Sequence, residues 1–296
     1  MKHAFLIIAH ANWRQLGDLV AQLDDPMHDI YVHVDRRARG FDAEALRGRA
    51  NRSAVFIYRE YAVCWGDASQ MYAPLFLMQR ASAADEYDYY HILSGMDLPL
   101  KTNAELHAFF EAHPGCEFLS VRALTPKKDA EKIRRARLYH LLTRRRTESA
   151  LAVLLDRALI AAQIALGVNR LRGEKWQIMY GSNWASLTHD FVRCVCDHAE
   201  KLRRLFRWTN NADELYLQTI AYNCGFMDRI YQPENGERVN LRYTDWKRGN
   251  GKSPYTFRAE DYAMLRANIN LFARKFSEGV DREIIDRILS DLNARA

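Results

Sequence analysis

Residues 4–34 read AFLIIAHANWRQLGDLVAQLDDPMHDIYVHV, and this stretch decides the fold. It begins with an unbroken apolar run, 4–9, and ends with a second one, 30–34, each of a length typical of a buried strand. Between the runs, apolar residues recur at the three- and four-residue spacing of a helix that buries one face: Leu16, Leu19, Val20 and Leu23. The stretch therefore predicts a strand, a helix and a second strand.

The same alternation continues down the chain. Apolar runs follow at 54–58, 89–93 and 117–121, with helical spacing at 67–82 and 103–112. Such alternation predicts an α/β fold, a mixed but mostly parallel sheet flanked by helices. Apolar residues make up 48% of the 296 and charged residues 27%, the balance of an ordinary globular protein.

A single domain is expected, in three parts. Residues 1–121 form a nucleotide-binding half, 122–175 a basic and helical insert, and 176–296 an acceptor and catalytic half. In open sheets of this type ligands bind beyond the carboxyl ends of the strands. His10, Asp35 and Asp97 follow predicted strands and are candidates on that ground, although each residue type also serves as a turn former or cap.

The cysteines are odd in number and lack the spacing of a zinc motif. They are Cys64, Cys116, Cys194, Cys196 and Cys224. We expect buried thiols in a reduced compartment and no bound metal.

Positive charge is concentrated in one stretch. Residues 122–146 hold ten Lys or Arg against two acidic residues, whereas the whole chain carries a net charge of only +6. The stretch suits a phosphate-bearing or membrane-surface partner, but a solvated helix face would give the same pattern. Nucleic acid is not expected as a partner, because Tyr139 is the one aromatic residue among these cations.

Residues 149–168 form a strongly apolar helical pattern bracketed by arginines at 144–146 and 170–172. This pattern fits a helix lying on a membrane surface and also a helix packed on the protein's own core. No signal peptide and no run of eighteen uncharged apolar residues is evident. We therefore expect a cytoplasmic protein, with peripheral contact to the inner face of the membrane through 144–172.

Glu214 is the candidate general base. Asn210 or Asn211 can cap a helix there, so Glu214 is expected on its first turn, where the helix dipole favours an ionised carboxylate. Acidic residues are also favoured at that position for stability alone.

Cations gather near the C-terminus and could hold a diphosphate: Lys247, Arg248, Lys252, Arg258, Arg274 and Lys275. The chain has no Asp-x-Asp pair of the kind that binds a divalent ion in many nucleotide-sugar transferases. Either basic side chains replace the metal, or its ligands have another pattern.

Several stretches together resemble one enzyme family. The most specific is 93–102, Leu-Ser-Gly-Met-Asp-Leu-Pro-Leu-Lys-Thr, and it is accompanied by 32–37, 181–184, 213–214 and 271–276. In this order they resemble the core-2/I-branching β-1,6-N-acetylglucosaminyltransferases, a family that also contains peptide O-xylosyltransferases and bacterial members. The resemblance implies a GT-A-like fold and an inverting, metal-independent sugar transfer without a cofactor.

The resemblance also implies roles for individual residues. Glu214 would remove the proton of the acceptor hydroxyl. Asp35 would contact the uracil or ribose of the donor near His10, and Asp97 lies in the signature of the donor half.

Further matches concern the diphosphate and the acceptor. Lys275, with Arg274 beside it, would bind the diphosphate. A second phosphate-binding cation aligns near Lys252, with Arg248 and Arg258 as rivals. Trp246 resembles a tryptophan on which the acceptor sugar stacks.

The expected donor is UDP-N-acetylglucosamine, followed by UDP-xylose and UDP-galactose. The expected acceptor is a glycan or a lipid-linked glycan in bacterial surface-polysaccharide or glycolipid synthesis. A protein of the same fold that binds a nucleotide, a carbohydrate or a nucleic acid without catalysis is the alternative.

Overall fold

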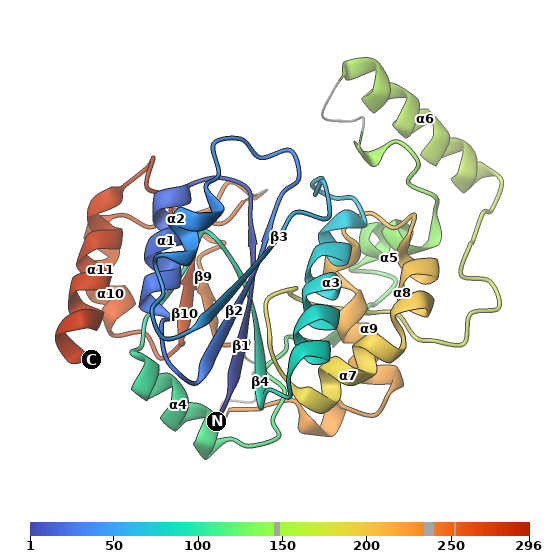
Figure 1. The fold of residues 1–296 in the computed structure, drawn as a ribbon. Helices are drawn as coiled ribbons and strands as arrows, with labels where there is room; N and C mark the ends of the chain where they lie inside the picture. The colour runs from blue at the N-terminus through green and yellow to red at the C-terminus, as the bar shows by residue number, and fades with distance from the viewer. Residues whose placement is uncertain (145–148, 234–239, 252) are drawn as a thin grey trace.

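The computed structural model describes residues 1–144, 149–233, 240–251 and 253–296. Its main sheet has five strands in the order β3-β2-β1-β4-β8. Four of them run parallel: β1 (His3–Ala9), β2 (His28–Val34), β3 (Ala54–Tyr58) and β4 (Tyr89–Ser94). The edge strand β8 (Ser186–Thr188) runs antiparallel to β4. The predicted α/β class with a mixed, mostly parallel sheet is confirmed (Figure 1).

The two faces of β1 bury alternate side chains. Ala4 and Leu6 belong to one apolar core, while Phe5 and Ile7 belong to the other. The first core lies under α3 (Ser69–Ala84), α7 (His189–Asp197), α8 (Ala199–Phe206) and α9 (Tyr216–Asn223). The second lies under α1 (Trp13–Gln22), α2 (Ala43–Arg47) and α4 (Asn103–Ala112). Helices therefore cover both faces of the sheet (Figure 1).

A second, three-stranded sheet joins distant parts of the chain. Its order is β5 (Asp97–Pro99), β10 (Phe272–Arg274) and β9 (Arg242–Thr244). The antiparallel register of β5 and β10 places Arg274 opposite Asp97. A third apolar cluster joins this sheet to the C-terminal helices α10 (Tyr262–Arg266) and α11 (Arg282–Arg295), and the short 3-10 helix η4 (Ala259–Asp261) directly precedes α10.

The stretch 93–102 forms the junction of the two sheets. It contains the end of β4, a tight turn and β5, and Thr102 then caps α4. The Thr102 hydroxyl accepts the amide proton of Glu105, and the Glu105 carboxylate accepts that of Thr102, which makes a capping box. This junction fixes Asp97 at the carboxyl end of β4.

Two predicted elements differ from the structure. The run 117–121 is not a strand of the main sheet, because β8 occupies the position beside β4. Phe118 instead exchanges two backbone hydrogen bonds with Ser186 of β8, at 2.9 and 3.1 Å. The apolar residues within 177–180 also predict a strand, but only β7 (Met179–Tyr180) forms there, and it pairs with β6 (Arg122–Ala123).

The insert 122–175 contains α5 (Ala130–Arg137) and α6 (Ala150–Ala165). Helix α6 stands away from the main body of the molecule (Figure 1). Only Ala152 and Asp156 of α6 are buried, so the structure does not support a helix packed on the core. With 16 residues α6 is too short to cross a bilayer, and no other helix in the described ranges is long and apolar enough either.

Candidate active site

Glu214 ends a short 3-10 turn, η2 (Ala212–Glu214), and α9 begins only at Tyr216. The prediction that Glu214 lies on the first turn of an α-helix is wrong, because Asn211 adopts a left-handed conformation, φ 54°, and its side chain caps nothing. The Asn211 amide instead donates to the Gly66 carbonyl at 2.8 Å. This contact with the loop before α3 sets where η2 starts.

Gly181 fixes the other side of Glu214. Its amide donates to the Glu214 carbonyl at 2.9 Å. A Cβ at position 181 would lie 1.8 Å from the Ser120 carbonyl oxygen, so no other residue fits without moving the backbone. The Gly181-Ser182 pair of the sequence thus brings two chain segments close beneath the candidate base.

The Glu214 carboxylate lies among positively charged and aromatic side chains. Its Oε2 accepts a hydrogen bond from Arg135 Nη1 at 3.2 Å, and the side chain is 30% exposed. Burial raises the pKa of Glu214, while Arg135 and Tyr180 hold the increase back. The result is a carboxylate that is more basic than usual and still open to solvent, which suits a general base.

Arg135 comes from α5, in the basic stretch of the insert. Around it, Arg122 and Lys132 lie 4.7 and 4.8 Å from the Tyr180 ring centroid. Part of the positive stretch therefore faces Glu214. Sequence reasoning missed Arg135 and Tyr180 because their contact depends on the β6–β7 pairing of segments about sixty residues apart.

Asp213 is the second carboxylate of the site. Burial, followed by the negative charge of Glu214, raises the pKa of Asp213 to about 7, and Arg135 and Arg274 oppose this rise. Its Oδ1 has no hydrogen-bond partner among the described residues. Two adjacent carboxyl groups with raised pKa values can retain a proton near neutral pH.

Arg274 interacts with both Asp213 and Asp97. Its Nε lies 3.8 Å from Asp97 Oδ1, and its guanidinium stacks 4.0 Å above the Trp184 ring. Nη1 is buried and has no partner among the described residues. Burial lowers the pKa of Arg274, and both Asp97 and Asp213 oppose this. Within the described part of the chain, Arg274 thus has one donor without a partner, and it interacts with two carboxylates.

Asp97 is completely buried and already well bound. It accepts hydrogen bonds from the Ser94 amide at 3.0 Å and the Ser94 hydroxyl at 2.6 Å. Together with the ion pair to Arg274, these contacts occupy its carboxylate. Its geometry fits a residue that orients Arg274.

Asp35 and His10 lie at the carboxyl edge of β2 and β1, as predicted. The Asp35 carboxylate accepts hydrogen bonds from the Arg37 amide at 2.8 Å, from the Arg37 guanidinium, and from the Val63 amide at 2.9 Å. These bonds lower the pKa of Asp35 and fix the loop after β3. His10 directly follows β1 and is exposed.

The predicted phosphate-binding cations differ in their surroundings. Lys275 Nζ lies 3.5 Å from Ser253 Oγ, and burial lowers its pKa, with Arg274 adding to the effect. Arg248 is held by Asp245 and Asp261, both at 2.7 Å, and stacks on Tyr255. Arg248 therefore braces its own loop. Arg258 precedes η4, and Lys252 lies outside the described residues.

Trp246 extends from the loop after β9, and 58% of its surface is exposed. An exposed tryptophan next to a cationic loop is a surface on which a sugar ring can stack. A separate depression of about 420 Å³ lies at the opposite edge of the sheet, lined in part by Tyr89, Thr188 and Arg229. None of the candidate residues described above borders that depression.

The arrangement defines a class of protein. Carboxylates and cations meet beyond the carboxyl ends of a mostly parallel sheet, as in nucleotide-dependent α/β enzymes. Comparison with known proteins specifies this further: the chain belongs to the Core-2/I-Branching enzyme family, whose profile matches residues 3–267.

Among named relatives, xylosyltransferase 2 of Canis lupus familiaris is 25% identical over 307 residues, and xylosyltransferase 1 of Homo sapiens is 26% identical over 311. Each alignment covers 96% of this chain but 33% and 30% of the relative. The chain thus spans about a third of the length of these relatives. Among solved structures, mouse xyloside xylosyltransferase 1 in its apo form matches with a TM-score of 0.37 and 10% identity, covering 92% of this chain and 96% of that one.

Proposed function

We propose that this chain is an inverting glycosyltransferase in which Glu214 is the general base. The observation that carries the proposal is the position of Glu214: part-exposed, with a raised pKa, and next to Asp213, which interacts with Arg274. A base for the acceptor and a cation for the leaving group thus belong to one connected cluster. Membership of the Core-2/I-Branching enzyme family supports the proposal that the chain is an enzyme.

The proposed reaction is a single displacement. Glu214 takes the proton of the acceptor hydroxyl, and the oxygen attacks the anomeric carbon from the face opposite the nucleotide. The bond between that carbon and the diphosphate oxygen breaks, and its electron pair stays on the diphosphate. The transition state has oxocarbenium character, as in glycoside hydrolysis.

Cations receive the charge that develops on the diphosphate. The proposed donors to the diphosphate are Lys275 and Nη1 of Arg274, an atom that has no partner among the described residues. Lys252 is proposed as a further cation. Asp97 orients Arg274 from the opposite strand. The absence of an Asp-x-Asp pair from the sequence supports a transfer that these cations sustain without a divalent metal.

The proposed donor is a UDP-sugar, bound near Asp35 and His10 at the carboxyl edge of β1 and β2. UDP-N-acetylglucosamine is the first choice. UDP-xylose follows, in view of the xylosyltransferases among the relatives, and then UDP-galactose. A thermal-shift screen of these donors tests which one binds, because a bound donor raises the melting temperature. Repeating the screen with EDTA tests whether donor binding needs a divalent metal.

The decisive test of the proposed base is Glu214→Gln. We expect turnover to fall by about 10²-fold or more, the usual scale for a positioned base, while binding of the donor is kept. Asp213→Asn is the matched variant, because it removes the neighbouring charge and leaves the base. Near-normal transfer by Glu214→Gln would contradict the assignment.

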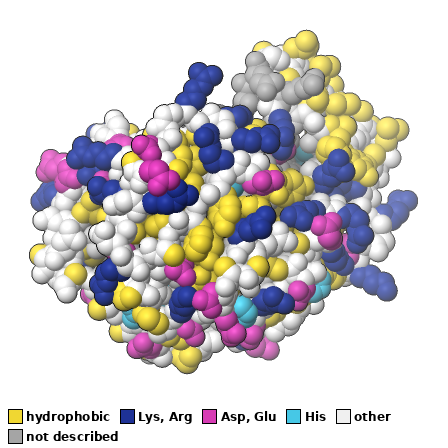
Figure 2. Space-filling model, viewed as in Figure 1, with side chains coloured by type: hydrophobic (Ala, Val, Ile, Leu, Met, Phe, Trp, Pro, Cys, Tyr) yellow, Lys and Arg dark blue, Asp and Glu magenta, His cyan; other side chains and the backbone are white. Residues whose placement is uncertain are grey.

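We also propose that α6 brings the enzyme to an anionic membrane, where a lipid-linked glycan serves as the acceptor. The helix exposes large apolar side chains along its length: Leu151, Leu154, Leu155, Leu159 and Ile164. Figure 2 shows this apolar surface at the edge of the molecule, with cations next to it. Arg157 and Arg172 are exposed on and beside the helix. The setting would be bacterial surface-polysaccharide or glycolipid synthesis.

Vesicle sedimentation tests the membrane proposal. Replacing Leu151 and Leu154 with Ser should weaken binding to vesicles of phosphatidylglycerol and phosphatidylcholine by at least about 10-fold, given about 1.5–3 kcal/mol per buried leucine. Ile269→Ser is the control, since Ile269 is 85% exposed but lies outside α6. Equal binding by both variants would contradict the proposal.

A further inference from the structure

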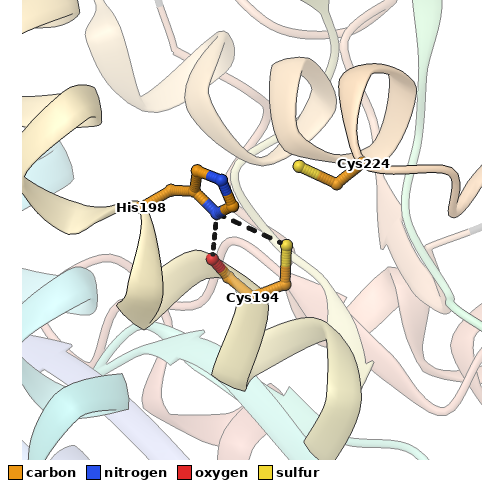
Figure 3. Close-up of side chains that lie close together, drawn as sticks. All are labelled: Cys194, His198 and Cys224. Atoms are coloured by element: carbon orange, nitrogen blue, oxygen red, sulfur yellow. Dashed lines mark hydrogen bonds between the residues drawn. The ribbon is translucent and has the colours of Figure 1, made fainter.

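Two cysteines and a histidine lie together on the α7–α9 side of the molecule, apart from the candidate active site. Cys194 lies on α7, His198 directly follows it, and Cys224 follows α9. Their two sulfur atoms and one imidazole nitrogen all lie within 4.8 Å of one another. Figure 3 shows the ring and both thiols directed toward one shared space.

The backbone holds these three groups in place. Cys194 and His198 are four residues apart, so they face the same side of α7, the spacing at which paired helical ligands bind zinc. The Cys224 amide donates to the Ile220 carbonyl at 2.9 Å at the end of α9. Phe191 of α7 is in edge contact with Phe226, which lies just after α9, and their ring centroids are 4.8 Å apart.

The hydrogen bonds of His198 determine which nitrogen is available. Its Nδ1 lies 2.9 Å from the Cys194 carbonyl oxygen and 3.6 Å from the Cys194 sulfur. Because a carbonyl only accepts, Nδ1 carries the ring proton and Nε2 is left unprotonated. Histidines that bind metals commonly donate their other ring N–H to a backbone carbonyl in this way.

We propose that Cys194, His198 and Cys224 bind a single zinc-class ion. Two thiolates and a neutral imidazole would balance the charge of Zn²⁺, and soft sulfur with imidazole is the ligand set that this ion prefers. Zinc bonds of about 2.3 Å to sulfur and 2.0 Å to nitrogen require the ligands to move inward slightly. Water would complete a tetrahedral site.

Binding would replace the proton of each thiol by the metal. The ion would fasten the end of α7 to the end of α9, the helix that follows Glu214. This proposal differs from the expectation of metal-free thiols drawn from the sequence.

Cobalt titration of the fully reduced, metal-free protein tests the site. We expect one equivalent of Co²⁺ to bind with a thiolate-to-metal charge-transfer absorption, and Zn²⁺ to remove that absorption. Saturating Zn²⁺ should raise the melting temperature by several degrees. Cys194→Ser and Cys224→Ser should each lose the absorption, and His198→Ala, which keeps both thiols, should bind at least about 10-fold more weakly.

Cys196→Ser is the matched control. Cys196 lies on the same helix as Cys194, but its sulfur contacts Ser82 Oγ at 3.6 Å, so this variant should bind cobalt like the wild type. Far-ultraviolet circular dichroism of the metal-free variants confirms that each is folded. An absence of charge-transfer absorption in the wild type would overturn the proposal. So would an equivalent of metal that survives in Cys194→Ser but is lost in His28→Ala, since Asp25, His28 and His107 form the other close group of potential ligands in the described ranges.

Discussion

Helices α3 and α6 have the same length, 16 residues, and both are rich in apolar side chains, yet they occupy opposite environments. Eight residues of α3 are buried against β1, β2 and α7, whereas two residues of α6 are buried. The apolar surface of α3 is used in folding. That of α6 remains exposed after folding, so equal apolar content stabilises the fold in one helix and stays available for contacts in the other.

The largest expected difference is in stability. Leu75 in α3 is fully buried and Leu154 in α6 is 63% exposed. Leu75→Ala should lower the free energy of unfolding by about 2–5 kcal/mol, because a cavity replaces well-packed atoms. Leu154→Ala should change it by less than about 0.5 kcal/mol. Urea denaturation measures both, and an equal loss in the two variants would show that α6 is packed in solution.

A second prediction compares a cation of the candidate active site with a cation on α6. Lys275→Ala should lower kcat by about 10²-fold, because the lysine would stabilise charge that develops on the leaving diphosphate. Arg157→Ala, which removes an exposed cation from α6, should leave kcat on a soluble acceptor unchanged. Steady-state transfer assays compare them. Similar losses in both would place the reaction next to α6.

The smallest expected effect is a displacement of the pH profile. Transfer needs ionised Glu214, so kcat/KM should rise with pH through the raised pKa of this residue. Arg135 lowers that pKa, so Arg135→Gln should move the rising limb to higher pH. Arg157→Ala should leave the limb in place. A limb that does not move in Arg135→Gln would mean that Arg135 does not control the base.

Much of the fold follows from local sequence pattern. The apolar runs of β1 to β4 and the apolar spacing in α1, α3 and α4 predict those elements. A strand or helix that buries a face repeats its apolar residues every few positions, so the pattern is visible in a short window of sequence. The position of β8 was not predictable in this way. Its three residues are too few for a periodic signal, and their pairing with β4 joins segments about a hundred residues apart.

The candidate site was predicted in its residue types and less well in its contacts. Glu214, Asp97 and Arg274 were found through motifs, but the Arg135 contact depends on how the insert folds back over η2. The 3-10 turn at Glu214 depends on the left-handed Asn211, a local conformation that the capping pattern of two asparagines did not distinguish from a helix start. Likewise Cys224, the proposed partner of Cys194, lies thirty residues ahead, directly after another helix.

The position of strand β10 in the chain determines when one residue of the proposed active site is synthesised. It is the last strand in the chain, and it alone sets Arg274 opposite Asp97. The ribosome synthesises all five strands of the main sheet, the last of which ends at Thr188, long before it adds residue 274. The cation that we propose for the leaving group is therefore added only after the strands of that sheet.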